Sequence, residues 1–207
     1  MTLQNEYLWT FATPRVRWFL YRKSRSGQVS EEVLGEEFGG TVTCDFYAGY
    51  NRLGGLQRCW VHLIRDLAEL AEVNADRPGV VAWVETIKVL YQEAKQFSHP
   101  QERVGRRQRR HFERRLAAPQ RVLAQRIIRH LGELFLFLGD PRVPADNNLA
   151  ERSLRPAVLA RKISGGARSA KGSRTRRALV SLFGTWQVQG KPLLASCRQL
   201  LLPTQTT

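Results

Sequence analysis

Short runs of β-branched and aromatic residues mark the first third of the chain as a region of strands. Two such runs, at residues 7–12 and 16–21, lie close enough together to predict a β-hairpin. Further strands are predicted at residues 41–44 and 56–59, after a short helix at residues 30–34. The first third is therefore expected to be mixed α/β.

From residue 60 onward the apolar residues take the spacing of helices. Trp60, Leu63, Ile64, Leu67 and Ala71 recur every three or four positions, which predicts an amphipathic helix. The same spacing predicts three more helices, at residues 80–97, 102–116 and 119–138.

The C-terminal part is also helical in pattern. A helix is expected to begin near Asn148 and to run to residue 163, before the Gly165-Gly166 pair. A longer helix is predicted at residues 173–187, and a short one follows Pro192. The longer helix carries a stripe of large side chains that we expect to be buried: Leu179, Leu182, Phe183 and Trp186.

The composition indicates a folded and strongly basic protein. Of the 207 residues, 43% are hydrophobic, which is enough for a core and argues against global disorder. The formal net charge is +15 and the isoelectric point is near 10.8, so a polyanion such as DNA or RNA is the expected partner. The cations gather in two blocks, at residues 103–129 and 152–177.

Nothing in the sequence directs the chain to a membrane or to an oxidising compartment. The N-terminus lacks the basic start and apolar run of a signal peptide, and no apolar stretch is long enough to span a bilayer. Cys44, Cys59 and Cys197 are unevenly spaced, which argues against a disulfide scaffold. A cytoplasmic location is therefore expected.

Glu151 is a single acid within the second basic block. Asn148 followed three residues later by Glu151 is a capping-box pattern, which would explain the glutamate by helix initiation alone. The functional interpretation is that the cations hold a DNA backbone while the acid holds a metal ion. The residues themselves leave both interpretations open.

Asp45 lies where a predicted strand meets a turn. Functional side chains gather at the carboxyl ends of strands in open α/β sheets, but an aspartate in a turn also bonds its own backbone. Together with Glu151 it could hold Mg²⁺, which proteins usually bind through one or two carboxylates. A two-metal site generally needs a third acid.

The segment after Cys59 offers two further interpretations. Cys59 and His62 could form one half of a zinc site, but no second pair has matching spacing. His62, Arg65, Asp66 and Glu69 also fit a solvated helix face with ion pairs four residues apart.

The second basic block has glycine and serine between its cations, so backbone N–H groups can approach phosphates closely. The spacing of a nucleotide phosphate loop is absent, and nucleotide hydrolysis is not indicated. The candidate DNA-binding residues are Arg152, Arg155, Arg161, Lys162, Arg168, Lys171 and Arg174.

Short segments running in order from Tyr7 to Trp186 resemble a known family, the transposases of insertion sequence 66. That family belongs to the DDE superfamily, whose catalytic fold is ribonuclease-H-like. The segments are Tyr7-Leu8-Trp9, Val33-Leu34-Gly35, Asp45-Phe46-Tyr47 with Tyr50, Gln57-Arg58-Cys59-Trp60 with His62 and Arg65, Asn147-Asn148, Ala150-Glu151-Arg152, Leu154-Arg155-Pro156, Arg161-Lys162, and Ser181-Leu182 with Thr185-Trp186. Each is weak alone, and together they are specific.

The resemblance implies an α/β fold: a ribonuclease-H-like core with a mixed sheet and flanking helices, interrupted by an all-helical insertion. The N-terminal part of the core would cover residues 1–72 and the insertion residues 73–140. Residues 141–207 would form the C-terminal helical part, with the third acid and the basic DNA-binding segment.

The resemblance also implies roles for residues. Asp45 would be the second and Glu151 the third acid of the catalytic triad, both ligands of Mg²⁺ or Mn²⁺. His62 and Arg65 would be accessory residues. The implied reaction is metal-dependent cleavage at the ends of a mobile element, followed by attack of the 3′-hydroxyl on target DNA. Double-stranded DNA at the bacterial nucleoid is the implied partner, and a second copy or an intact transposase is a further candidate.

The chain departs from the family at its N-terminus. The first catalytic aspartate of the family lies on a strand before the Tyr-Leu-Trp segment, whereas only residues 1–6 precede Tyr7 here and none is an aspartate. That strand is central in the fold, so two strand edges are expected to lack a partner. We therefore expect a truncated core that is inactive alone. Binding of Mg²⁺ or Mn²⁺ is implied for the intact family and not for this chain by itself.

Two alternatives remain open. A non-catalytic DNA-binding protein, for instance a regulator of an intact transposase, would explain the charge equally well. A metal-dependent nuclease that uses Asp45 and Glu151 alone is disfavoured, because two acids are too few for a two-metal site.

Overall fold

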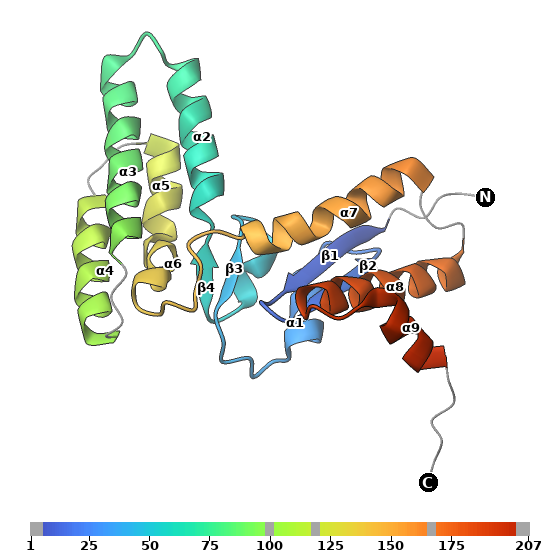
Figure 1. The fold of residues 1–207 in the computed structure, drawn as a ribbon. Coiled ribbons are helices and arrows are strands. Elements are labelled where there is room, and N and C mark those ends of the chain that lie inside the picture. The colour runs from blue at the N-terminus through green and yellow to red at the C-terminus, as the bar shows by residue number, and fades with distance from the viewer. Residues whose placement is uncertain (1–5, 98–101, 117–120, 165–168, 202–207) are drawn as a thin grey trace. The chain divides into compact units, whose positions relative to one another are not determined.

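The computed structural model describes residues 6–97, 102–116, 121–164 and 169–201. The fold is mixed α/β and mostly helical, with two small sheets among these residues. The chain forms two compact units (Figure 1). We call Met1–Val29 with Asn148–Thr207 the terminal unit, and Ser30–Asn147 the central unit. Helix α1 (Gln28–Leu34) runs across the boundary between them.

A β-hairpin is the frame of the terminal unit. Strands β1 (Tyr7–Ala12) and β2 (Arg17–Arg22) pair antiparallel, with Tyr7 opposite Arg22. Thr13 closes the turn, because its backbone N–H donates to the Val16 carbonyl at 2.9 Å and its hydroxyl accepts from the Val16 N–H at 3.0 Å. The predicted hairpin is confirmed, with its second strand one residue later than expected.

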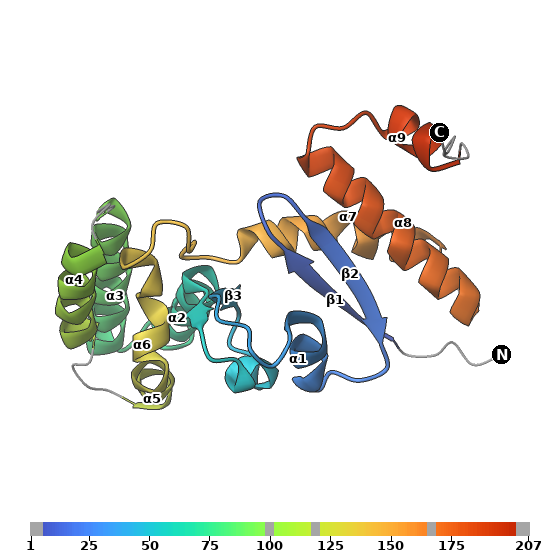
Figure 2. The ribbon, with the colours of Figure 1, turned by 90° about the horizontal axis from the view of Figure 1, so that it is seen from below.

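Three helices complete the terminal unit: α7 (Asn148–Ser164), α8 (Ala170–Val188) and α9 (Leu193–Leu201). Helix α7 packs on β1 and α8 on β2, as Figure 2 shows. The segment with Gly165-Gly166, where a helix break was predicted, lies outside the described residues.

Hydroxyl groups of α8 close the outer edge of β2. The backbone N–H of Phe19 donates to Ser181 Oγ at 3.0 Å. The Arg17 N–H donates to Thr185 Oγ1 at 3.0 Å, and the Thr185 hydroxyl donates to the Arg17 carbonyl at 3.1 Å. Backbone groups that a further strand would use are thus satisfied by a helix, which protects this edge from pairing with another chain.

The prediction that α8 buries its large apolar stripe is wrong. Leu179, Leu182 and Phe183 are exposed and Trp186 is half-buried. The inner face of the helix carries small residues because it approaches β2 closely: a Cβ at Gly184 would lie 3.1 Å from Arg17 Cβ. Hydrophobic spacing alone did not reveal which face of the helix needed to be small.

The central unit begins with two short parallel strands, β3 (Val42–Cys44) and β4 (Leu56–Arg58), in which Val42 lies opposite Leu56. The 3₁₀ helix η1 (Ala48–Arg52) lies between them. A helical block follows, made of α2 (Trp60–Val73), α3 (Pro78–Gln96), α4 (Glu102–Leu116), α5 (Arg121–Arg129), α6 (Leu131–Leu134) and the 3₁₀ helix η2 (Leu136–Leu138).

Trp60 is at the centre of the core of the central unit. Its fully buried ring stacks on Tyr91, with centroids 4.6 Å apart, and contacts Phe135 at 5.2 Å. The apolar stripe predicted from Trp60 onward is confirmed, because Leu63 and Leu67 are also fully buried in this core.

The single helix predicted over residues 119–138, of which 119 and 120 lie outside the described residues, is wrong. The structure breaks it at His130 and Phe135, whose backbone angles are not helical. Side chains from β4 and α2 take the backbone groups that a continuous helix would use. The Leu134 carbonyl accepts from Trp60 Nε1 at 2.6 Å and from Gln57 Nε2 at 2.9 Å. The Phe137 N–H donates to Gln57 Oε1 at 3.0 Å.

A polar pair lies beside this break. His130 is buried, and its Nδ1 lies 3.1 Å from Glu133 Oε2. Burial lowers the pKa of His130, and the nearby Arg58 lowers it further, while Glu133 partly offsets both effects.

Among the helices of the described ranges, none combines the length and apolar character needed to cross a bilayer.

We predict that Ser181→Ala destabilises the terminal unit by about 1–3 kcal/mol, since it leaves the buried Phe19 N–H without its acceptor. The readout is the protection of the Phe19 amide from hydrogen exchange, together with thermal unfolding. Thr175→Ala, on the exposed side of α8, is the control and should change stability by no more than about 0.5 kcal/mol. Equal effects of the two substitutions would contradict the edge-closing role.

We also predict that stability falls on acidification because of His130. The unfolded chain binds a proton near pH 6.5, whereas the folded state binds it only at lower pH, so the unfolded state gains protons first. The free energy of unfolding should therefore fall as pH drops below about 6.5. His130→Gln should flatten this dependence in denaturant titrations, while His111→Gln, at an exposed position, should not.

Candidate active site

Asp45 directly follows the last residue of β3, at the carboxyl end of the parallel strand pair. Its Oδ1 accepts a hydrogen bond from the Tyr47 N–H at 2.8 Å. This is the turn geometry expected of an aspartate that bonds its own backbone. It also fixes the direction of the carboxylate, so the two interpretations of Asp45 are compatible.

A buried arginine lies behind Asp45. Arg58, the last residue of β4, has a fully buried side chain. It donates from Nη1 to the Asp45 carbonyl at 2.8 Å and from Nε to Glu133 Oε2 at 2.5 Å, and Nη2 contacts Asn51 Oδ1. Arg58 was not predicted as a site residue, because its partner Glu133 is distant in the sequence.

Glu151 lies in the first turn of α7, in the terminal unit. The partial positive charge of a helix N-terminus stabilises a carboxylate at such a position. The helix begins at Asn148 as expected, and the capping-box interpretation of Asn148 and Glu151 stays a prediction.

The structure places Asp45 and Glu151 in different compact units. Their joint metal site therefore stays a prediction. Within the described ranges, no three His, Cys, Asp or Glu side chains gather in a way that could hold a metal ion. Each acid is nevertheless held at the end of a regular element, which is how a rigid ligand is built.

The accessory candidates lie on α2. His62 is half-buried and Arg65 is exposed, both in the first two turns of the helix that follows β4. Asp66, expected to pair within this helix, instead forms an ion pair with Arg126 of α5. Cys59 is buried and its Sγ accepts from the Asn147 N–H at 3.4 Å; burial raises the pKa of this thiol, so the protonated form is favoured at neutral pH.

The net charge divides unequally between the two units. The terminal unit has sixteen Lys and Arg against two acids, Glu6 and Glu151, a formal charge of +14. The central unit has seventeen against sixteen, a charge of +1. Nearly all of the excess positive charge is therefore in the unit that contains α7 and α8.

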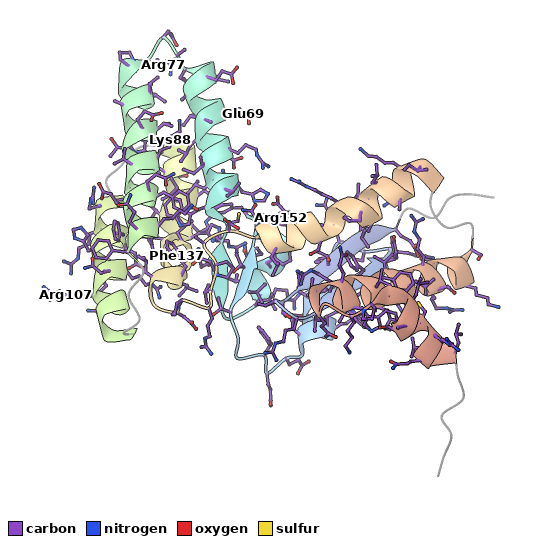
Figure 3. The ribbon with its side chains drawn as sticks, viewed as in Figure 1. Glu69, Arg77, Lys88, Arg107, Phe137 and Arg152 are labelled. Atoms are coloured by element: carbon purple, nitrogen blue, oxygen red, sulfur yellow. The ribbon has the colours of Figure 1, made fainter. Side chains whose placement is uncertain are left out.

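The first basic block is balanced by acids of its own unit. Arg109 pairs with Glu113 at 2.8 Å, and Arg115 pairs with Glu93. Figure 3 shows Glu69 on α2 and Arg107 on α4, on opposite sides of the helical block in this view. Acids and cations thus share this surface, which weakens its attraction for a polyanion.

The candidate DNA-binding residues on α7 and α8 are exposed: Arg152, Arg155, Arg161, Lys162, Lys171 and Arg174. Arg168 lies outside the described residues. Glu6 ties the two helices to the hairpin, because its carboxylate accepts from the Ser173 hydroxyl at 2.8 Å and its carbonyl accepts from Arg161 at 3.2 Å.

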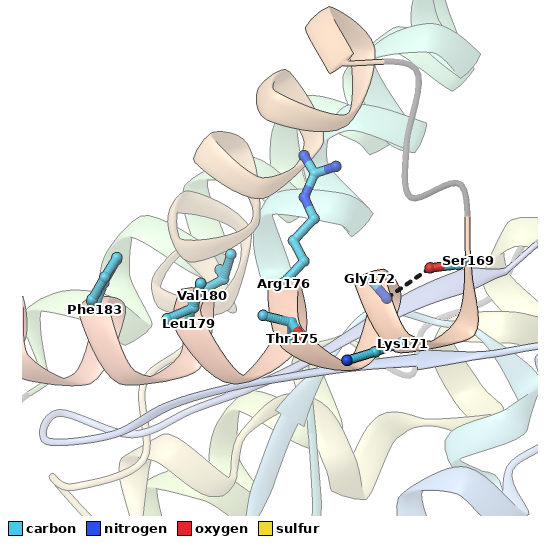
Figure 4. Close-up of a pocket in the computed structure, with 8 residues that line it drawn as sticks. All are labelled: Ser169, Lys171, Gly172, Thr175, Arg176, Leu179, Val180 and Phe183. Carbon is cyan, nitrogen blue, oxygen red and sulfur yellow. Dashed lines mark hydrogen bonds between the residues drawn. The ribbon is translucent and has the colours of Figure 1, made fainter. Parts of the chain in front are cut away.

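The exposed face of α8 borders an open groove of about 600 Å³ (Figure 4). The helix begins with a capping bond, in which Ser169 Oγ accepts the Gly172 N–H at 3.1 Å. Two cations, Lys171 and Arg176, line the N-terminal part of the groove together with Ser169, Gly172 and Thr175. Leu179, Val180 and Phe183 line the rest.

Comparison with known proteins gives a family for the chain. The chain is 31% identical, over 163 residues, to a protein of Sinorhizobium fredii (strain NBRC 101917 / NGR234) described as "Uncharacterized protein y4jO". The match covers 73% of this chain and 50% of that protein, so the chain spans about half the length of this curated relative. No solved structure matches. The sequence profile described as "Transposase IS66 family" matches residues 2–175, and the chain therefore belongs to this family of transposases.

Proposed function

We propose that the chain is part of the catalytic core of a DDE-type DNA transposase, in which Asp45 and Glu151 are the second and third catalytic acids. One observation carries the proposal. Asp45 is fixed at the carboxyl end of a parallel strand pair, and the other candidate acid opens a helix in a unit of charge +14. Such a unit attracts DNA, and the acids supply oxygen ligands for a divalent cation.

The proposed core is ribonuclease-H-like. In that fold a central strand lies beside the strand that bears the second acid, which is β3 here. The described sheets have two strands each, β1 with β2 and β3 with β4. Since α8 closes the outer edge of β2, the edge of β1 is the one at which the hairpin would extend into a larger sheet.

The acids present fit a hard cation. The Tyr47 N–H engages one oxygen of the Asp45 carboxylate, and a metal ligand needs only the other. Mg²⁺ or Mn²⁺ bound there would polarise a DNA phosphate and stabilise the attacking and leaving oxygens. We propose accessory roles for His62 and Arg65, whose helix follows β4 directly.

Two acids are fewer than the three that the reaction uses. We therefore propose that this polypeptide, tested by itself, binds DNA but does not complete strand transfer. The cations of α7 and α8 are proposed to grip the DNA backbone near the scissile phosphate.

The shared metal site predicts paired cleavage by iron. Fe²⁺ with ascorbate and peroxide generates hydroxyl radicals that cut the backbone near the bound ion. If Asp45 and Glu151 hold one ion, the purified chain should be cut near both residues. Asp45→Asn or Glu151→Gln should abolish both cuts, because each substitution removes one of the two charged ligands. Fragment masses report the positions.

Asp76→Asn is the control for this experiment, because Asp76 is exposed in the loop between α2 and α3. It should leave both cuts unchanged. Cleavage near Asp45 that persists in Glu151→Gln would show that the two acids do not share an ion.

The charge division predicts which cations bind DNA. Arg155→Ala and Lys162→Ala in the terminal unit should each reduce the slope of log affinity against log salt concentration by about 1, because each removes one phosphate contact. Fluorescence anisotropy with duplex DNA at several salt concentrations measures the slope.

Arg114→Ala is the matched control, since this exposed arginine of α4 lies in the nearly neutral central unit. Its slope should equal that of the unmodified chain. If only Arg114→Ala reduced the slope of log affinity against log salt concentration, the DNA-binding surface would lie on the helical block instead of the terminal unit.

A further inference from the structure

Arg58 joins three parts of the central unit that are far apart in the sequence. Its buried guanidinium contacts the Asp45 carbonyl after β3, Asn51 in η1 and Glu133 in α6. A guanidinium removed from water is tolerated only where acceptors compensate it. Loss of one of these acceptors should therefore change the position of the guanidinium and weaken its other two contacts.

Both the backbone carbonyl and the side-chain carboxylate of Asp45 accept hydrogen bonds. Its carbonyl accepts from Arg58 at 2.8 Å, and its carboxylate accepts from the Tyr47 N–H at 2.8 Å. Arg58 thus holds the peptide of Asp45, and the Tyr47 N–H holds the carboxylate itself. The bond from Tyr47 reports on the direction of the carboxylate, because it forms only when the carboxylate turns back over the loop.

The helical block reaches the same loop at a second point. Phe46, next to Asp45, lies under the guanidinium of Arg126 at 4.9 Å and against the ring of His130 at 5.7 Å. Arg126 belongs to α5, and His130 lies between α5 and α6, beside Glu133. The Asp45–Phe46 segment is thus held by the region in which the helix predicted over residues 119–138 is broken.

We propose that the helical block controls the orientation of the Asp45 carboxylate through Glu133 and Arg58, because Glu133 of α6 holds the guanidinium that in turn holds the Asp45 carbonyl. The inference rests on the proposed role of Asp45 as a metal ligand. Arg58 and Glu133 are positioning residues, because they act on the peptide of Asp45 and not on the metal or DNA.

The test is hydrogen exchange of the Tyr47 amide in the whole chain. Glu133→Gln removes the charge that holds Arg58, and the Tyr47 amide should then exchange at least about tenfold faster. The amide of Leu63, in the core of the same unit, should keep its rate. Glu93→Gln removes another arginine partner of the same block, that of Arg115, and should change neither rate.

A conservative variant separates positioning from general stability. Glu133→Asp retains the charge and should recover most of the Tyr47 protection, even if Glu133→Gln proves too unstable to measure. Loss of Leu63 protection in parallel with that of Tyr47 in Glu133→Asp would reduce the pair to a structural role and overturn the inference. Unchanged Tyr47 exchange in Glu133→Gln would overturn it as well.

Iron cleavage distinguishes this inference from the proposed function. If the function holds, Glu133→Gln should weaken the cut near Asp45 severalfold while the DNA affinity stays the same. If the unmodified chain shows no cut near Asp45 but Tyr47 exchange responds to Glu133→Gln, the positioning stands and the metal role fails. A cut near Asp45 that is present but unchanged in Glu133→Gln would overturn the positioning role of Glu133 and leave the proposed metal role standing.

Discussion

The central unit depends on the burial of one guanidinium group. Arg58 cannot leave water without acceptors, and the acceptors it finds come from the loop after β3, from η1 and from α6. This requirement fixes where the helical block stands relative to the two short strands. The two three-residue strands are also supported from outside their sheet: β4 is buried throughout, and Gln57 of β4 bonds the Leu134 carbonyl of α6.

The terminal unit faces the opposite constraint, because its charges repel one another. A formal charge of +14 with only two acids opposes compaction, and few of its large apolar residues are buried. Glu6 offsets some of this repulsion by linking α7 and α8 to the start of the hairpin. A polyanion on the exposed cations would stabilise this unit directly, so DNA binding and stability are expected to be linked.

The elements that are local in the sequence could be predicted from it. The hairpin, the strand before Asp45 and the helix from Trp60 appear within a residue or two of their predicted limits, because spacing and turn residues decide them. The break at His130 and the inward face of α8 could not be predicted in this way. Gln57 and Trp60 bond the backbone at the helix break, and the edge of β2 determines which face of α8 is inward. In both cases the contacting residues are distant in the sequence. Asp45 and Glu151 are predicted from residue type, position and family resemblance, and their shared role stays a prediction, whereas the contacts of Arg58 are visible only in the fold.

The hydroxyl groups of Ser181 and Thr185 give the hairpin a direction of growth. Because they occupy outward-facing backbone groups of Arg17 and Phe19, a further strand could not pair with β2 at these residues and would have to add at β1. A second chain that approaches β2 at these residues meets α8, so strand pairing is left to β1. Two small side chains therefore restrict where this hairpin can be extended, although they belong to a helix and not to the sheet.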